Sequence, residues 1–165
     1  MFFVVVKNSD NLVYGKQTGP DKPPDTAERT YVELTAAEYA ALGSLTLEQG
    51  GGPAYMLDNG SIVPRPDARF RVRMTLNTAN PTDGNFVNMT FELLNADGSP
   101  NAATGTRAIG VRIDSETRQV RLSLTNGAAT VNKRLPRSGE YSFYTVEPDF
   151  YKIEGDTRFS VLEDW

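Results

Sequence analysis

The sequence contains no cysteine and no histidine. The lack of cysteine excludes a disulfide framework, thiolate metal ligands and a thiol nucleophile. The lack of histidine removes the commonest general base, the commonest zinc ligand and the usual serine or cysteine triads. Catalysis through carboxylates remains open, but no carboxylate pair is singled out by its spacing, and glycine-rich phosphate loops are missing. We therefore expect a protein that is not an enzyme and uses no cofactor or metal.

Strongly basic segments and long apolar runs are also missing. Seventeen basic and twenty-one acidic residues give a net charge of −4, so we expect no nucleic-acid partner. No apolar run is long enough to span a bilayer, so we expect no membrane partner. The apolar run at residues 2–6 ends at Lys7 and lacks both a charged leader and a cleavage site. It does not have the features of a signal peptide.

From Asp67 onward, apolar and polar residues alternate in short segments separated by turn-forming residues. A period of two predicts half-buried β-strands. We expect seven or eight strands in about one hundred residues, which is typical of an immunoglobulin-like Greek-key β-sandwich in an all-β chain. The residues expected to face inward are Phe70, Val72, Met74, Leu76, Val87, Met89, Phe91, Leu93, Ile109, Val111, Ile113, Val120, Leu122, Leu124, Tyr141 and Phe143.

Residues 1–66 predict a smaller β-rich region. Residues 2–6 and 11–16 predict a hairpin, and residues 19–25 form a proline-rich arm. Thr35 and Glu38 have the spacing of a capping box, which predicts one short helix. Prolines at 64 and 66 do not fit a central strand. The predicted domains are therefore an N-terminal anchoring region, 1–66, and a sandwich, 67–165.

The hairpin and the arm are candidate contacts between subunits, because an isolated apolar hairpin is marginal in water. An edge hairpin of a small domain is the alternative. The candidate subunit contacts are Phe2, Phe3, Val5, Leu12, Tyr14, Pro23 and Pro24.

Aromatic residues gather toward the C-terminal end. They predict either a surface for sugar stacking or partner binding, or core filling. The candidate surface residues are Tyr144, Phe150, Tyr151 and Trp165. A row of arginines at positions 69, 71 and 73 predicts a solvated face, with an anion contact or a salt-bridged interface as alternatives.

The second half carries a series of turn and strand motifs at Asp97, Gly98, Pro100, Gly105, Asn126, Gly127, Ala129, Val131, Gly139 and Tyr141. These motifs resemble those of bacterial immunoglobulin-like modules of the invasin type. The resemblance implies the sandwich fold. The step from Gly139 to Tyr141 is similar to a tyrosine corner, in which the hydroxyl bonds back to the backbone.

The phrase at residues 32–42, followed by glycines at 50–52, resembles accessory structural proteins of tailed bacteriophages, of the capsid-decoration or tail-appendage type. This resemblance implies a virion protein assembled in the bacterial host cytoplasm, with capsid or tail proteins as partners. Particle lattices present threefold sites, so a homo-oligomer, and a trimer in particular, is expected. The alternative is a carbohydrate- or host-surface-binding module with a glycan as partner.

Overall fold

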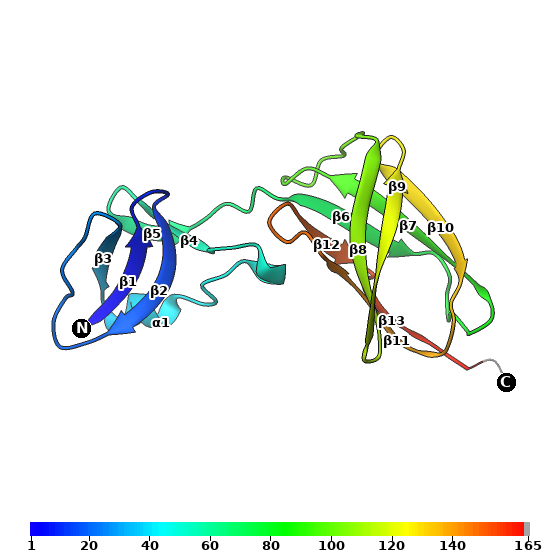
Figure 1. The fold of residues 1–165 in the computed structure, drawn as a ribbon, viewed down its shortest axis with the longest axis horizontal. Helices are drawn as coiled ribbons and strands as arrows, with labels where there is room; N and C mark the ends of the chain where they lie inside the picture. The colour runs from blue at the N-terminus through cyan, green and yellow to red at the C-terminus, as the bar shows by residue number, and fades with distance from the viewer. Residues whose placement is uncertain (164–165) are drawn as a thin grey trace. The chain divides into compact units, whose positions relative to one another are not determined.

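The computed structural model describes residues 1–163, which are mostly β-strands (Figure 1). The predicted all-β class is confirmed. The chain divides into two compact units, Met1–Asp67 and a second that begins at Ala68. Each unit has a hydrophobic core of its own.

The N-terminal unit is a five-stranded sheet in the order β3-β1-β2-β4-β5. Its strands are β1 (Phe2–Lys7), β2 (Leu12–Thr18), β3 (Arg29–Leu34), β4 (Tyr55–Asp58) and β5 (Ser61–Pro64). The predicted hairpin is confirmed, because β1 pairs antiparallel with β2. Asn59 and Gly60, both with positive φ, form the turn between β4 and β5, as an Asn-Gly pair predicts.

The short helix α1 (Ala36–Ala41) begins at the predicted capping box. The Thr35 hydroxyl accepts a hydrogen bond of 3.2 Å from the Glu38 backbone N–H, and the Glu38 carboxylate accepts one of 2.8 Å from the Thr35 N–H. A 3₁₀ turn, η1, spans Glu48–Gly50. Within residues 1–163, no helix has the length and apolar content of a membrane span.

The core of the N-terminal unit lies on one face of the sheet. Its buried members are Val4, Val6 and Val13, and the partly buried residues around them are Val32, Leu34, Leu42, Leu45, Tyr55, Leu57 and Ile62. Because side chains alternate along a strand, Phe3 and Val5 of β1 point to the opposite face. That opposite face is the one that carries the site described below.

The proline-rich arm folds back on its own unit. Asp25 accepts a hydrogen bond of 2.7 Å from the backbone N–H of Tyr31 in β3. At the other end of the arm, the Met1 ammonium donates to the Gly19 carbonyl at 2.8 Å. Since β3 ends the strand order, the Asp25 carboxylate satisfies a backbone donor on an edge strand, which reduces the tendency of that edge to pair with another chain.

The second unit is a sandwich of two four-stranded sheets, β10-β7-β6-β12 and β13-β11-β8-β9. Its strands are β6 (Phe70–Leu76), β7 (Phe86–Leu94), β8 (Gly105–Ile113), β9 (Glu116–Leu124), β10 (Ala128–Arg134), β11 (Gly139–Thr145), β12 (Tyr151–Gly155) and β13 (Arg158–Val161). A single cluster of apolar residues from both sheets forms the core.

The connections follow the predicted immunoglobulin-like Greek key. Strands β8 and β9 form a hairpin in one sheet, the chain crosses to the other sheet at β10, and it returns at β11 (Figure 1). Near the end of the chain, β12 pairs in parallel with β6, and β13 pairs antiparallel with β11. Strand β12 is therefore an edge strand of one sheet, and β13 is an edge strand of the other.

Two residues expected in the core are exposed. Val120 faces inward in register with Ile109 but is 44% exposed. Among the described residues, β9 is the last strand of its sheet, so no further strand covers Val120 on that side. Phe70, the first residue of β6, is 42% exposed. The period-two pattern correctly predicts that these side chains point toward the core. The prediction that they are buried is wrong.

The predicted solvated face is correct for Arg73, which is exposed, whereas Arg71 is half-buried and Arg69 is buried. Arg71 lies 2.7 Å and Arg73 lies 3.6 Å from the Glu154 carboxylate, measured from nitrogen to oxygen. Arg69 is 4% exposed and donates to the Pro148 carbonyl at 2.9 Å. These guanidinium groups stabilise the parallel pairing within the sandwich.

Candidate functional site

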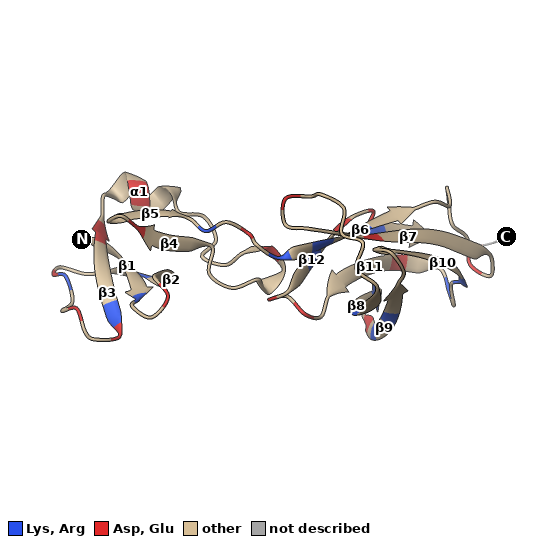
Figure 2. Cartoon of the chain, turned by 90° about the horizontal axis from the view of Figure 1, so that it is seen from above, with Lys and Arg blue, Asp and Glu red and all other residues tan. Residues whose placement is uncertain are grey.

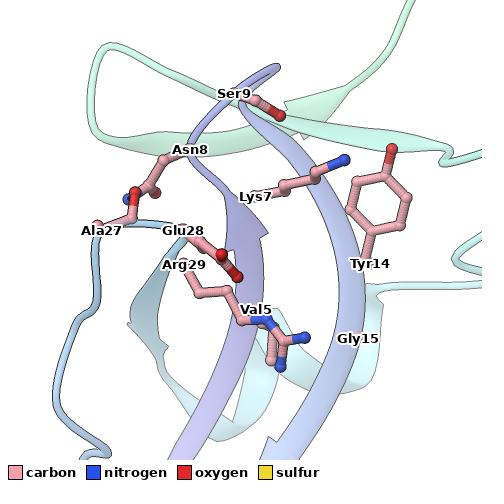
Figure 3. Close-up of a pocket in the computed structure, with 9 residues that line it drawn as sticks. All are labelled: Val5, Lys7, Asn8, Ser9, Tyr14, Gly15, Ala27, Glu28 and Arg29. Atoms are coloured by element: carbon pink, nitrogen blue, oxygen red, sulfur yellow. The ribbon is translucent and has the colours of Figure 1, made fainter.

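An open hollow of about 810 Å³ lies on the face of the N-terminal sheet opposite its core (Figure 3). We call it the N-terminal hollow. Its lining residues are Val5, Lys7, Asn8, Ser9, Tyr14, Gly15, Ala27, Glu28 and Arg29. They come from β1, β2, the turn between these strands, and the start of β3.

A β-bulge shapes the floor of the hollow. Val5 pairs with Gly15 and Val6 pairs with Val13, so Tyr14 is the extra residue of β2. Bulges redirect side chains, and Tyr14 is 53% exposed. Gly15 has no side chain beside Val5, so the floor stays low and apolar.

Charged groups of both signs surround this floor. Figure 3 shows the Lys7 side chain extending toward the Tyr14 ring, and Glu28 and Arg29 entering from the side of β3. The Lys7 ammonium lies 5.7 Å from the ring centroid of Tyr14. Lys7 and Arg29 are register neighbours across β1 and β3. The rim can therefore form hydrogen bonds and ion pairs with a partner.

The Tyr14 hydroxyl has a fixed local partner. It donates a hydrogen bond of 3.1 Å to the Asp10 carboxylate. Partial burial, followed by this hydrogen bond, raises the pKa of Tyr14 above its usual value. Tyr14 is therefore a neutral phenol at physiological pH, and its ring is oriented by Asp10.

Two of the predicted subunit contacts, Val5 and Tyr14, are brought together in the hollow. Phe3 is fully buried within the chain, so its assignment as a subunit contact is wrong. Phe2 lies on the helix side of the sheet, with its ring centroid 5.0 Å from that of Tyr39.

The remaining predicted contacts lie outside the hollow. Leu12 is half-buried where β2 pairs with Met56 of β4. Pro23 is half-buried and Pro24 is exposed, both in the arm. Sequence reasoning missed Glu28 and Arg29, which reach the hollow only because β3 pairs with β1. No local pattern in the sequence signals that pairing.

On the second unit, Tyr144 lies on the outer face of the sheet β13-β11-β8-β9 and is half-exposed, as its alternation with Phe143 predicts. It pairs across the strands with Gly110. A Cβ atom at Gly110 would lie only 2.3 Å from the Tyr144 ring, so the ring packs directly on the glycine backbone. The Arg112 guanidinium lies 5.9 Å from the ring centroid.

The other three aromatic candidates do not extend this surface. Tyr151 is 1% exposed and donates its hydroxyl hydrogen to the Ala108 carbonyl, so it belongs to the core and its assignment to a binding surface is wrong. Phe150 is 71% exposed beside the start of β6, where its carbonyl accepts from the Phe70 N–H at 3.0 Å. Trp165 lies outside the described residues.

In the part of the chain that the structure describes, no cluster of three or more acidic residues could hold a metal ion. Basic and acidic residues are interspersed on both units (Figure 2). Comparison with family models, with curated proteins and with solved structures finds no match for this chain.

Proposed function

We propose that this chain is a non-enzymatic structural protein of a bacteriophage particle, which binds neighbouring subunits through the N-terminal hollow. The observation that carries the proposal is the exposed Tyr14 ring beside the apolar floor made by Val5 and Gly15. An exposed aromatic residue, an apolar centre and a polar rim are the usual parts of a protein–protein interface.

The rest of the N-terminal unit supports this use of the hollow. The arm covers one sheet edge through Asp25, and the core occupies the opposite face. Lys7, Glu28 and Arg29 supply charges of both signs, which favour a defined register with a partner over nonspecific sticking.

The phage context follows from the resemblance of residues 32–42 to accessory virion proteins. In this proposal the partners are capsid or tail proteins, and the chain forms a homo-oligomer, favoured as a trimer. The sandwich would clamp adjacent subunits or present an outer surface of the particle. Assembly would take place in the cytoplasm of the bacterial host.

A pair of variants tests the role of the hollow. In the first, Tyr14→Ser is combined with Arg29→Glu, which removes the aromatic residue and reverses one rim charge. The control combines Phe86→Ser with Arg134→Glu, an exposed aromatic–arginine pair of the sandwich with the guanidinium 5.0 Å from the ring centroid. Sedimentation velocity should show weaker self-association by at least about tenfold for the first variant only. An equal change in self-association in the two variants would contradict the proposal.

A second candidate function is carbohydrate or host-surface binding by the sandwich. One specific observation favours it, namely the half-exposed Tyr144 ring lying on Gly110 beside Arg112. An aromatic ring held flat on a sheet provides an apolar surface on which a sugar ring can stack.

A further inference from the structure

Two arginines flank one serine on the outer face of the sheet β13-β11-β8-β9. Ser142 of β11 is the register neighbour of Arg112 in β8 and of Arg158 in β13. The two arginine Cα atoms are therefore two strand spacings apart, about 10 Å. A shallow hollow of about 240 Å³ lies over this row. Its lining residues are Arg112, Asp114, Glu140, Tyr141, Ser142 and Arg158.

The carboxylates of this hollow are already engaged. Asp114 accepts a hydrogen bond of 3.0 Å from the Glu140 backbone N–H and lies 3.8 Å from the Arg137 guanidinium. The Glu140 carboxylate accepts a hydrogen bond from the Ser160 hydroxyl. Across residues 1–163, neither Arg112 nor Arg158 forms an ion pair. Within residues 1–163, the Arg112 and Arg158 guanidinium groups are therefore not ion-paired with either of the two carboxylates that line the same hollow.

The outer face of this sheet carries more basic than acidic residues, although the chain is acidic. Asp114, which follows β8, adds a second carboxylate beside Glu140. At the outward positions of its paired strands the charged residues are Arg112, Arg121, Arg158 and Glu140. The net charge of the chain is −4. An excess of positive charge on one face of an acidic protein favours an anionic ligand at that face.

The aromatic ring lies in the next row of the same face. Tyr144 is two residues from Ser142 along β11, or about 7 Å. On the far side of Gly110, β9 contributes Gln119, the register neighbour of Gly110. A flat ring, an amide and two guanidinium groups are thus within the reach of one hexopyranose unit and its neighbour.

We infer that this face binds an acidic saccharide, a sugar ring that carries a carboxylate, such as a uronic acid. The sugar ring stacks on Tyr144, the carboxylate binds the guanidinium groups of Arg112 and Arg158, and Gln119 hydrogen-bonds to hydroxyl groups. This inference deepens the second candidate function and rests on it, and it is independent of the N-terminal hollow.

The test measures binding of the full chain to polygalacturonate by isothermal titration calorimetry. Dextran serves as the neutral saccharide, polyglutamate as a carboxylate polymer without sugar rings, and oligouridylate as a nucleic acid. The expected result is binding to polygalacturonate at least about tenfold tighter than to each of the other three polymers. Equal or tighter binding of polyglutamate or oligouridylate would overturn the inference, because charge or base stacking would then suffice.

Variants identify the groups involved. Arg112→Gln and Arg158→Gln should each weaken polygalacturonate binding by about fivefold or more. Tyr144→Ala should weaken it by about tenfold, whereas Tyr144→Phe should bind polygalacturonate about as tightly as the unmodified protein does. Arg134→Gln is the matched control, because Arg134 also lies over an aromatic ring, that of Phe86, in the opposite sheet. An equal loss in this control would overturn the inference. Melting temperatures verify that each variant is folded.

The remaining outcomes separate the inference from the second candidate function. If dextran binds as tightly as polygalacturonate, and Tyr144→Ala abolishes this binding, the carbohydrate-binding function holds. The inference that the saccharide is acidic would then be overturned. No binding to either saccharide would overturn both. Neither result bears on the N-terminal hollow.

Discussion

The Tyr141 hydroxyl donates a hydrogen bond of 2.8 Å to the backbone carbonyl of Arg137, four residues earlier. The ring of Tyr141 is buried in the sandwich and stacks on Phe159, with 5.7 Å between the ring centroids. Burial raises the pKa of Tyr141, so its hydroxyl remains a hydrogen-bond donor at physiological pH. This contact anchors the turn between β10 and β11 to the core, and it confirms the predicted tyrosine corner.

The first prediction concerns this contact. Tyr141→Phe keeps the ring and removes the hydroxyl, so we expect the free energy of unfolding to fall by about 1 kcal/mol. Urea unfolding followed by circular dichroism measures the change. Tyr144→Phe is the control and should have little effect, since no hydrogen bond of that hydroxyl is found within residues 1–163. Equal stability of the two variants would contradict the anchoring role.

The second prediction concerns the packing of Tyr144 on Gly110. In Gly110→Ala, the new methyl group would lie 2.3 Å from the ring, so the ring must leave its position. We expect a loss of about 1–3 kcal/mol, as for other overpacked sites. The loss should be smaller when Tyr144→Ala is also present, because the clash is then absent. A double-mutant cycle measures this coupling, and additive effects would show that the ring does not occupy this position.

The third prediction concerns acid stability of the N-terminal unit. The Tyr31 backbone N–H, followed by the Lys22 ammonium, lowers the pKa of the Asp25 carboxyl group below its usual value. A lowered folded-state pKa adds stability above the unfolded-state pKa of about 3.9, and this stability is lost as pH falls through the folded-state pKa. Asp25→Asn should therefore lower the melting temperature at neutral pH and have little effect once Asp25 is protonated.

The control for this prediction is Asp21→Asn, an exposed residue of the same arm. It removes the same charge without removing the Tyr31 hydrogen bond. Thermal unfolding of the three proteins between neutral pH and about pH 2.5 makes the comparison. A difference between Asp25→Asn and the unmodified protein that stays constant over this range would contradict the assignment.

Much of the fold follows from local patterns in the sequence. The inward rows of the sandwich, the capping box at Thr35 and the Asn-Gly turn at residues 59–60 all depend on neighbours within a few positions. The same alternation predicts the outer-face position of Tyr144. For Tyr151 the sequence leaves a binding surface and core filling as alternatives, because its burial depends on β12 pairing with β6, more than seventy residues away.

The candidate sites depend on long-range register, which the sequence does not reveal. Phe3 and Val5 share one face of β1, yet one is buried and the other lines the hollow. Arg112 and Arg158 lie on either side of Ser142 only because β8 and β13 both pair with β11 at that residue. A one-residue shift of either pairing would separate them.

The most direct test of the proposed assembly role is the solution mass of the full chain, measured by light scattering across a dilution series. The account predicts a stable species with three times the 18.1 kDa mass of one chain. It also predicts that Tyr14→Ser combined with Arg29→Glu shifts this species toward the monomer at higher concentrations than the Phe86 and Arg134 control. A monomer at every concentration would contradict assembly through the N-terminal hollow.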